Sequence, residues 1–584
     1  MKHRLLRTLS LLFLFTFPLV ANAVRTVTYG KFTYWYSSYK KAEVSIADNS
    51  YSGALEIPSE SPSINLESST AYNTYKVIGI HDSGFSGCTG LTSITIPSSV
   101  TMIGKNAFFG CTGLTEITIP YGVTSIGTNA FRRCANLSSI NVSAGNSKFS
   151  SYDGVLYDKA GKTIIYCPEG KTSITIPSTV TTIGSNAFEG CTGLTSVTIP
   201  NSVTTIGSNA FEGCTGLTSI TIPSSVTTIG KSAFYRCAGL TSVHIDDIAA
   251  WCNIQFGNYT SNPLCYAHKL YLSGTEITNL NIPNSVTTIG SNAFEGCTGL
   301  TSVAIGNSVT TIGESAFNGC VGLTSVAIPK SVVEIHNNAF ASCSNLSTIS
   351  IMGSADGSSR LNHVGNDPFY GTKWFNSQPD GVVYLDNFVC LRYKGEMPSA
   401  TAVTIPSTAR IIADVAFSGC TGLSSITIPI SVTYIGGSAF MNCRNLSSIT
   451  IPNSVTSLGQ SAFANCTGLK SLKIGDIDTD CASNLTMGDY CFNGCDNICE
   501  LTLGNVVKEH SSTNIFPKLN LTKLEIGKHF SLSATGIYPF ITFDYARLDT
   551  LRTLAPISAG LLAGATSLKS LTLSFPGVGT VDAF

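Results

Sequence analysis

The chain has 584 residues, more than one compact hydrophobic core usually holds, so several domains or a repeat array are expected. Its 34 basic and 35 acidic side chains nearly cancel, and charged residues make up only 12% of the chain. A chain with so little positive charge is not expected to bind nucleic acid. A hydrophobic content of 43% argues against disorder.

The first 23 residues have the pattern of a secretory signal peptide. A positively charged start precedes an apolar run from Leu11 to Val20 and the small-x-small sequence Ala21-Asn22-Ala23. The apolar run is too short to span a membrane, and no later segment has the required length. We therefore expect an exported protein, secreted or at the cell surface, whose mature chain begins near Val24.

Residues 24–84 do not follow the 23-residue period that begins after them. They are rich in Tyr and β-branched residues, which favour strands. Because an uncovered end of a repeat array is an open sheet edge, we predict that these strands form an N-terminal β cap.

Residues 85–475 repeat every 23 residues. The segment from Ala187 to Pro200 matches the segment from Ala210 to Pro223 almost letter for letter. Four cysteine triplets keep the same spacing: Cys88, Cys111, Cys134; Cys191, Cys214, Cys237; Cys297, Cys320, Cys343; and Cys420, Cys443, Cys466. A fixed period of this length indicates a solenoid, in which each coil packs on its neighbours.

One coil illustrates the expected structure. Leu194, Val197 and Ile199 should point into the core, and the alternate residues Ser196 and Thr198 should point outward. The proline that follows ends this strand, since it has no N–H to donate. The chain is therefore predicted to be a curved, β-rich array with few helices and a parallel sheet of short strands on its concave face.

The full pattern is Ala-Phe-x-x-Cys-x-x-Leu-x-x-Ile-x-Ile-Pro-x-x-Val-x-x-Ile-Gly. It resembles the BspA-like (Treponema pallidum-type) leucine-rich repeats over nearly the whole span from Phe85 to Phe463. The resemblance implies a leucine-rich-repeat solenoid in a secreted or cell-surface protein, commonly of bacteria that live with hosts. Some members adhere to host matrix proteins such as fibronectin and fibrinogen, a role that does not follow from the repeat itself.

Three inserts interrupt the repeats, near residues 144–170, 246–279 and 352–400. The first contains Asp153-Gly154, a predicted hairpin turn, and the third contains a similar Asp380-Gly381 beside a strand-like run. Trp251 and Trp374 lie in the second and third inserts. Their side chains either contact a ligand or seal the core where the coil is enlarged, and the second role is favoured because inserts must bury their own apolar residues.

Residues 476–584 form looser, degenerate repeats, in which Leu521-x-x-Leu524-x-Ile526 still fits the pattern. The chain stops at Ala583-Phe584, where a further coil is expected to begin. Whether the chain is a fragment or is anchored by other means stays open.

Most of the 20 cysteines should be buried free thiols. Cysteines at one repeat position stack about 5 Å apart and point the same way, which is poor geometry for a disulfide. Five cysteines outside this register are better placed for a bond, with Cys252 and Cys265 as one possible pair: Cys167, Cys252, Cys265, Cys390 and Cys481. The spacing Cys491-x-x-x-Cys495-x-x-x-Cys499 is not that of a zinc site, so no metal or other cofactor is expected.

No catalytic motif is present, and an enzyme is not expected. Gly161-Lys162-Thr163 lacks the first glycine of a phosphate loop. The acidic residues that recur at one repeat position should be solvated surface: Glu189, Glu212 and Glu295.

The function expected is adhesion to an extracellular protein or glycan through the concave face and the inserts. The candidate contact residues are Ser93, Thr95, Ser196, Thr198, Ser219, Thr221, Trp251, Trp374, Ser425 and Thr427. The alternative is a structural surface protein without a specific ligand, because Ser and Thr also suit any exposed strand. Threonine rows occur on ice-binding solenoids too, but the inserts argue against that role. The oligomeric state is not predicted.

Overall fold

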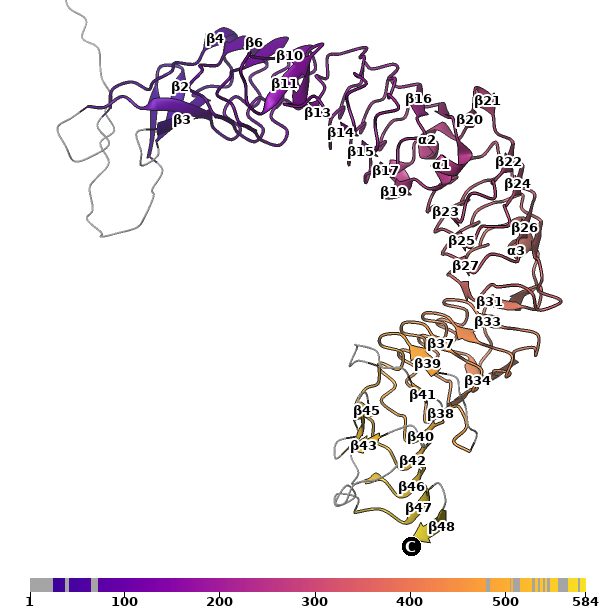
Figure 1. The fold of residues 1–584 in the computed structure, drawn as a ribbon. Helices are drawn as coiled ribbons and strands as arrows, with labels where there is room; N and C mark the ends of the chain where they lie inside the picture. Colours follow the sequence, from indigo (N-terminus) through magenta and orange to yellow (C-terminus); the bar gives the residue numbers. More distant parts are fainter. Residues whose placement is uncertain are drawn as a thin grey trace, which may run out of the picture. The chain divides into compact units, whose positions relative to one another are not determined.

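The computed structural model describes residues 25–36, 41–64, 72–478, 484–504, 506–507, 515–527, 531–533, 536–538, 541–542, 547–554, 566–575 and 578–583. The predicted signal peptide and Cys481 lie outside these ranges. The chain is a β-solenoid of about 20 turns of about 23 residues, as predicted (Figure 1). The chain forms two compact units, unit 1 (Met1–Ile174 and Ala187–Gly193) and unit 2 (Thr175–Asn186 and Leu194–Phe584).

Each regular coil carries two strands, although the sequence predicted one. We call the first set, at the Ser-x-Thr positions, the long ladder and the second set, at the Thr-Ile positions, the short ladder. In both ladders a strand pairs in parallel with the equivalent strand one coil away, as Ile206 pairs with Ile229. The backbone N–H groups that link successive coils thereby find acceptors, for example Thr227 N on Thr204 O at 2.9 Å.

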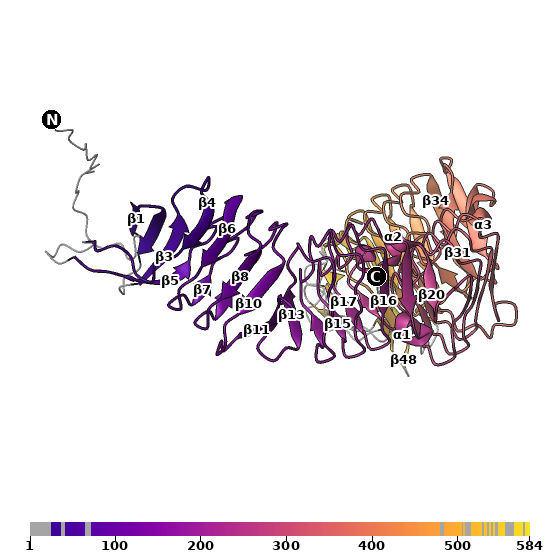
Figure 2. The same cartoon turned by 90° about the horizontal axis from the view of Figure 1, so that it is seen from above.

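In unit 1, the short ladder begins with an antiparallel meander and continues in parallel: β1 (Arg25–Tyr29), β2 (Phe32–Tyr36), β3 (Lys41–Ile46), β5 (Lys76–Ile80), β7 (Met102–Ile103) and β9 (Ser125–Ile126). The long ladder contains β4 (Ser52–Glu56), β6 (Gly90–Thr95), β8 (Glu116–Ile119) and β10 (Ser139–Val142). The strands predicted in residues 24–84 are therefore present, as Figure 2 also shows. Their role as a cap stays a prediction.

The first insert, also in unit 1, is an antiparallel meander of β11 (Phe149–Tyr152), β12 (Val155–Asp158) and β13 (Thr163–Tyr166). The predicted hairpin turn lies between β11 and β12, where Asp153 and Gly154 have φ values of 48° and 69°. These left-handed conformations favour Asp and Gly at the two central positions.

The short ladder of unit 2 runs through β14 (Thr182–Ile183), β15 (Thr205–Ile206), β17 (Thr228–Ile229) and β19 (Gln255–Phe256); β23 (Thr288–Ile289), β25 (Thr311–Ile312), β27 (Glu334–Ile335) and β29 (His363–Val364); and β31 (Val389–Lys394), β33 (Ile411–Ile412), β35 (Tyr434–Ile435), β37 (Ser457–Leu458), β39 (Asn484–Met487) and β41 (Val506–Val507).

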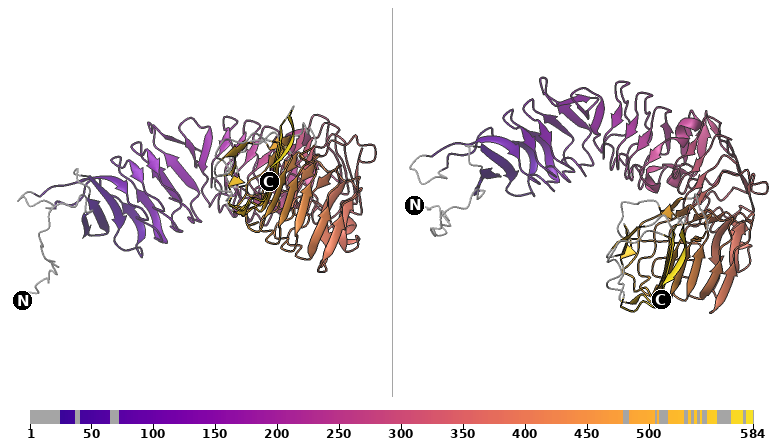
Figure 3. Two further views of the ribbon diagram at one scale, coloured as in Figure 1. Left: turned by 90° about the horizontal axis from the view of Figure 1, so that it is seen from below. Right: turned by 60° about the horizontal axis from the view of Figure 1, so that its bottom comes forward.

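The long ladder of unit 2 contains β16 (Ser219–Ile222), β18 (Ser242–Ile245) and β20 (Leu270–Leu272); β22 (Asn279–Asn281) and β24 (Ser302–Ala304); β26 (Ser325–Ile328) and β28 (Thr348–Ile351); β32 (Thr401–Thr404) and β34 (Leu423–Thr427); and β36 (Ser448–Ile451), β38 (Ser471–Ile474), β40 (Glu500–Leu503), β42 (Lys523–Ile526), β46 (Thr550–Thr553) and β47 (Ser570–Phe575). Figure 3 shows these strands from two further sides.

The remaining elements of unit 2 lie in the second and third inserts and near the C-terminus. They are α1 (Ile248–Cys252), the 3₁₀ helix η1 (Tyr259–Ser261), α2 (Leu264–Ala267), β21 (Thr275–Glu276), α3 (Lys373–Asn376), β30 (Gly381–Leu385), β43 (Ser531–Ser533), β44 (Gly536–Tyr538), β45 (Ile541–Thr542) and β48 (Val578–Ala583). The strand pair predicted in the third insert is β30 and β31, but its turn lies at Asp386-Asn387, whose φ values are 51° and 52°.

The last strand differs from the expectation that Ala583 would begin another coil. β48 instead runs antiparallel to β47 and pairs Ala583 with Leu571. The backbone of these residues therefore pairs with the last parallel strand, and the residues do not begin another coil.

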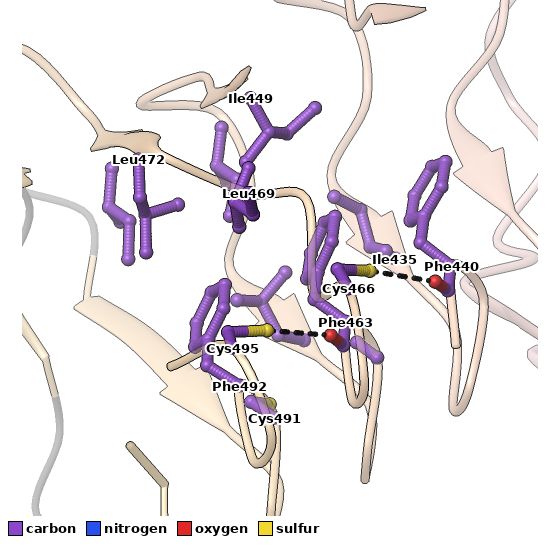
Figure 4. Packing of buried hydrophobic residues seen from close by; sticks show 14 of the residues in the cluster. Ile435, Phe440, Ile449, Phe463, Cys466, Leu469, Leu472, Cys491, Phe492 and Cys495 are labelled. Atoms are coloured by element: carbon purple, nitrogen blue, oxygen red, sulfur yellow. Dashed lines mark hydrogen bonds between the residues drawn. The ribbon is translucent and has the colours of Figure 1, made fainter. Parts of the chain in front are cut away.

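Phenylalanine side chains form continuous stacks inside the solenoid. Phe440 lies 5.2 Å from Phe417 and 4.9 Å from Phe463 between ring centroids, and the rings are nearly parallel. Figure 4 shows Phe440, Phe463 and Phe492 in successive coils. The stack follows from the repeat, because identical residues separated by one coil lie directly above one another.

Gly207, after the short strand β15, is predicted to be required because two coils approach closely there, whereas His336 and Ala413 stand at the equivalent position of other coils. A Cβ at Gly207 would lie 2.5 Å from the backbone N of Ser185, whereas a Cβ at Gly193 would have no neighbour closer than 3.5 Å. Gly207→Ala should therefore lower the free energy of unfolding by about 1–3 kcal/mol, and Gly193→Ala should change it little. Urea denaturation of the two variants compares them, and equal midpoints would contradict the close-approach argument.

Candidate binding surfaces

The predicted Ser/Thr contact residues lie on the long ladder and face away from the core. Val197 and Ile199 are buried, while the alternate residues Ser196 and Thr198 are exposed. Around Thr198 the pairing is limited to isolated bridges to Thr175 and Thr221, so the strand predicted there is only partly formed. The other members of the set are exposed apart from Ser219, which is half-buried: Ser93, Thr95, Thr221, Ser425 and Thr427.

From β15 to β27 in unit 2, the short-ladder strands follow the inner side of the bend and the long-ladder strands its outer side (Figure 1). The concave side predicted for the hydroxyl groups is therefore wrong for Ser219 and Thr221 in β16, and it stays a prediction for the other candidates. A short-strand parallel sheet does line the concave side, but it is made by the Thr-Ile strands. Alternation in the sequence showed which residues point outward, and it could not show which of two ladders lies inside the bend.

The two insert tryptophans have different surroundings. Trp251 in α1 is only 1% exposed, and its Nε1–H donates to the backbone O of Ala293 at 2.8 Å. It seals the core, so a ligand cannot contact its ring. Trp374 in α3 is half-buried and lies edge-on to Phe369 at 6.1 Å.

Exposed tyrosines, which the sequence analysis missed, lie in all three inserts. Tyr152 ends β11 and is 57% exposed, Tyr259 in η1 is 57% exposed, and Tyr370 is 54% exposed. Tyr370 also lies near Arg392, with the guanidinium carbon 5.9 Å from the ring centroid. The available signal was their position beside turn residues, where a large side chain has no coil above it to cover it.

The recurring glutamates are not all solvated, contrary to expectation. Glu189 is buried and forms an ion pair with Arg132. Glu169, which is not one of the recurring glutamates, accepts a hydrogen bond from the backbone N of Arg133 at 2.7 Å. Glu295 is half-buried, and burial raises its pKa although Asn318 donates to Oε1 at 2.9 Å. The position after Phe is shielded because the next coil lies against it.

The repeat-register cysteines are buried, as predicted, with the exception of Cys420, which is half-buried. Their thiols donate to the carbonyl of the Phe in the preceding coil, as Cys466 Sγ does to Phe440 O at 3.0 Å and Cys495 Sγ to Phe463 O at 3.1 Å (Figure 4). The same contact recurs at Cys111, Cys134, Cys237, Cys320, Cys343 and Cys443. Burial raises the pKa of Cys443 to about 12, which disfavours the reactive thiolate.

The thiols of the 491–499 segment point to three separate backbone carbonyls. Cys491 Sγ donates to Gly459 O, Cys495 Sγ to Phe463 O and Cys499 Sγ to Lys470 O. Across the described ranges, no three His, Cys, Asp or Glu side chains are grouped so that they could hold a metal ion.

The Gly161-Lys162-Thr163 segment is a hairpin turn between β12 and β13. The backbone N atoms of Lys162 and Thr163 donate to Asp158 Oδ1 at 2.7 and 2.9 Å. These amides bind a side chain of the chain itself, so the segment is not a phosphate loop.

Together, the stacked coils, two parallel ladders and buried Phe–Cys core define a leucine-rich-repeat β-solenoid. The model of the family described as BspA type leucine rich repeat region (6 copies) matches over residues 61–153, 162–258, 268–377, 393–480 and 479–576. The chain belongs to this family, as the repeat pattern predicted. A comparison with curated proteins gives no match.

Solved structures similar to this chain include bacterial leucine-rich repeat proteins. A leucine-rich repeat protein from Bacteroides ovatus is 24% identical, with 82% of this chain and 94% of that chain covered and a TM-score of 0.30. A leucine rich cell surface protein from Faecalibacterium prausnitzii is 22% identical, with coverage of 87% and 96% and a TM-score of 0.22. The T. pallidum leucine rich repeat protein is 22% identical, with coverage of 51% and 91% and a TM-score of 0.21. In the described part of this chain, no helix is long and apolar enough to cross a membrane.

Thiol titration should find few reactive cysteines in the folded protein. We expect most of the 20 thiols to react only after denaturation without reductant, because burial and hydrogen bonding keep them protonated and shielded. A count near zero after denaturation would show that disulfides had formed.

Glu295→Gln should stabilise the protein at neutral pH. A carboxyl whose pKa is raised in the folded state costs stability as pH rises above its unfolded pKa, and the cost is absent when both states are protonated. The variant should therefore melt a few degrees above the parent protein at pH 7 and at the same temperature as the parent at pH 4 or below. Glu116→Gln is the control because Glu116 is exposed, and an identical gain in that variant would contradict the role of burial.

Proposed function

We propose that this protein is a non-catalytic secreted or cell-surface protein that adheres to macromolecules of a host or a neighbouring cell. The inserts supply its principal contacts, and the Ser/Thr groups of the long ladder supply hydrogen bonds around them. Export rests on the predicted signal peptide, and the cell-surface role is consistent with the family to which the chain belongs.

The observation that carries the proposal is the exposed tyrosine in each insert. Most large aromatic side chains of the repeats are buried in the Phe stacks, so Tyr152, Tyr259 and Tyr370 depart from the pattern at the same places where the coil departs from its period. A tyrosine offers a large contact area at low entropic cost, together with a hydroxyl that binds polar groups. Exposing these three side chains to solvent does not stabilise the fold, so stability alone does not explain them.

The polar surface of the repeats supports binding rather than catalysis. Exposed hydroxyls of the long ladder donate and accept hydrogen bonds, and Ser196, Thr198 and Thr221 are typical. A long row of such groups suits an extended polymer that makes many weak contacts.

The test is surface binding of the exported chain to immobilised fibronectin, fibrinogen, collagen and a polysaccharide panel. We expect saturable binding to at least one of these, and a loss of about tenfold or more in the triple variant Tyr152→Ser, Tyr259→Ser, Tyr370→Ser. Tyr121→Ser is the matched control, because Tyr121 is also 57% exposed but lies in a repeat turn outside the inserts. Circular dichroism and thermal melting establish that each variant is folded.

Three results would contradict the proposal. Absence of binding across the panel by the folded chain would favour a structural surface role without a specific ligand. Full binding by the triple variant would move the contacts away from the inserts. An equal loss in Tyr121→Ser would show that tyrosine exposure, and not the insert, determines the effect.

A further inference from the structure

The short ladder of unit 2 changes its composition at one place. In regular coils its outward positions are threonines, as at Thr205, Thr228, Thr288 and Thr311. In and around the third insert, the same positions hold Glu334 in β27, His363 in β29 and Tyr434 in β35.

Two neighbouring positions depart from the repeat as well. His336 stands where regular coils have the glycine after the short strand, and Asp414 stands where they have Ser208 or Lys231. We call Glu334, His336, His363, Asp414 and Tyr434 the histidine cluster.

The members of the cluster contact one another. His336 Nε2 lies 3.3 Å from Glu334 Oε2, and His363 Nε2 lies 3.4 Å from Asp414 Oδ2. Tyr434 Oη donates to Asp414 Oδ1 at 3.4 Å, and Gly437 N donates to the same oxygen at 2.7 Å. The His363 ring meets the rings of His336 and Tyr434 edge-to-face, at 5.7 and 5.3 Å.

The cluster is partly exposed and lies over the core. The side chains of Glu334 and His336 are 43% and 39% exposed, and those of His363 and Asp414 are 24% and 21% exposed. Ile335, Val364 and Ile435 beneath them are buried. Ile411, in the same outward row, is also buried. The rings of His363 and Tyr434 lie beside Ile411, and covering it is a structural role for them. That role does not explain the presence of Glu334, His336 and Asp414.

The chemistry of the cluster favours a neutral polyhydroxyl ligand. Its two carboxylates repel an anion, and the nearby Arg410 directs its guanidinium to Ser431 O at 3.4 Å. The nitrogen and oxygen atoms do not converge on one point as metal ligands do. Carboxylates and imidazoles accept hydrogen bonds from neighbouring hydroxyls, and aromatic rings pack on the C–H groups of a sugar ring.

We propose that the histidine cluster is a binding site for a neutral saccharide, held by hydrogen bonds to Glu334, His336 and Asp414 and by packing on His363 and Tyr434. Burial and the neighbouring Asp414 carboxylate raise the pKa of Tyr434, so its phenol stays protonated and continues to orient that carboxylate. The site lies on the short ladder, whereas the Ser/Thr contact residues lie on the long ladder. It does not depend on the insert tyrosines, so it can bind whether or not the adhesion proposal holds.

The experiment is isothermal titration of the exported chain with maltohexaose, cellohexaose, mannohexaose and xylohexaose, and separately with heparin and with zinc chloride. We expect at least one neutral hexasaccharide to bind, and His363→Ala and Asp414→Asn each to weaken it about tenfold. Thr311→Ala, in the same row, and His244→Ala, a half-buried histidine of the long ladder, should bind as the parent does. The triple tyrosine variant should also bind the saccharide normally.

A failure of this site is distinct from a failure of the adhesion proposal. No binding of any hexasaccharide by the folded chain, or normal binding by the two cluster variants, would overturn it. Stronger binding of heparin, or zinc binding lost in His363→Ala without saccharide binding, would identify a different ligand class. If Asp414→Asn does not fold, Tyr434→Phe replaces it, because it keeps the ring and removes only the hydroxyl that orients Asp414.

Discussion

The fold depends on backbone hydrogen bonds between equivalent residues of neighbouring coils. In both ladders the N–H of one coil meets the carbonyl of the coil before it, as Thr227 N meets Thr204 O and Gly230 N meets Ile206 O at 2.9 and 2.8 Å. One coil alone has no partner for these groups, and leaving them unpaired in a buried position costs about 1–3 kcal/mol each. Coils of other lengths keep this pairing, as Thr228 pairs with Gln255 and Ser471 pairs with Glu500, because their extra residues lie between the strands.

This constraint decides which side chains occupy the core. Once the backbone repeats in register, each side chain lies over its own copy, so a residue must pack well against itself. Phe417, Phe440 and Phe463 do so as parallel rings, and the cysteine beside them adds a thiol that satisfies the carbonyl of the preceding Phe. Alanine at that position would leave the carbonyl without this donor, which gives a physical reason for cysteine in an array that uses no sulfur chemistry there.

The sequence predicted the parts of the structure that periodicity controls. The solenoid, its coil length, the inward side chains Val197 and Ile199 and the buried thiols follow from residues that recur at one position. The second ladder was missed because two residues such as Thr205-Ile206 are too few for alternation to be visible. The inserts were harder, since each occurs once: nothing in the sequence distinguishes the buried Trp251 from an exposed one, and only the contact with Ala293 O explains its position.

Functional residues in such an array are best sought where the repeat is broken without benefit to packing. Ser and Thr on the ladders recur at the same positions in many coils. They therefore form a continuous surface but do not indicate where on that surface a ligand binds. The insert tyrosines violate the repeat at exposed positions and the histidine cluster does so at half-buried ones, and the core beneath His363, formed by Val364 and Ile335, remains intact. Selection for stability alone would keep threonine where Glu334, His363 and Tyr434 stand, because threonine pairs at the same positions of other coils. The departures in the inserts and on the short ladder therefore point to ligands.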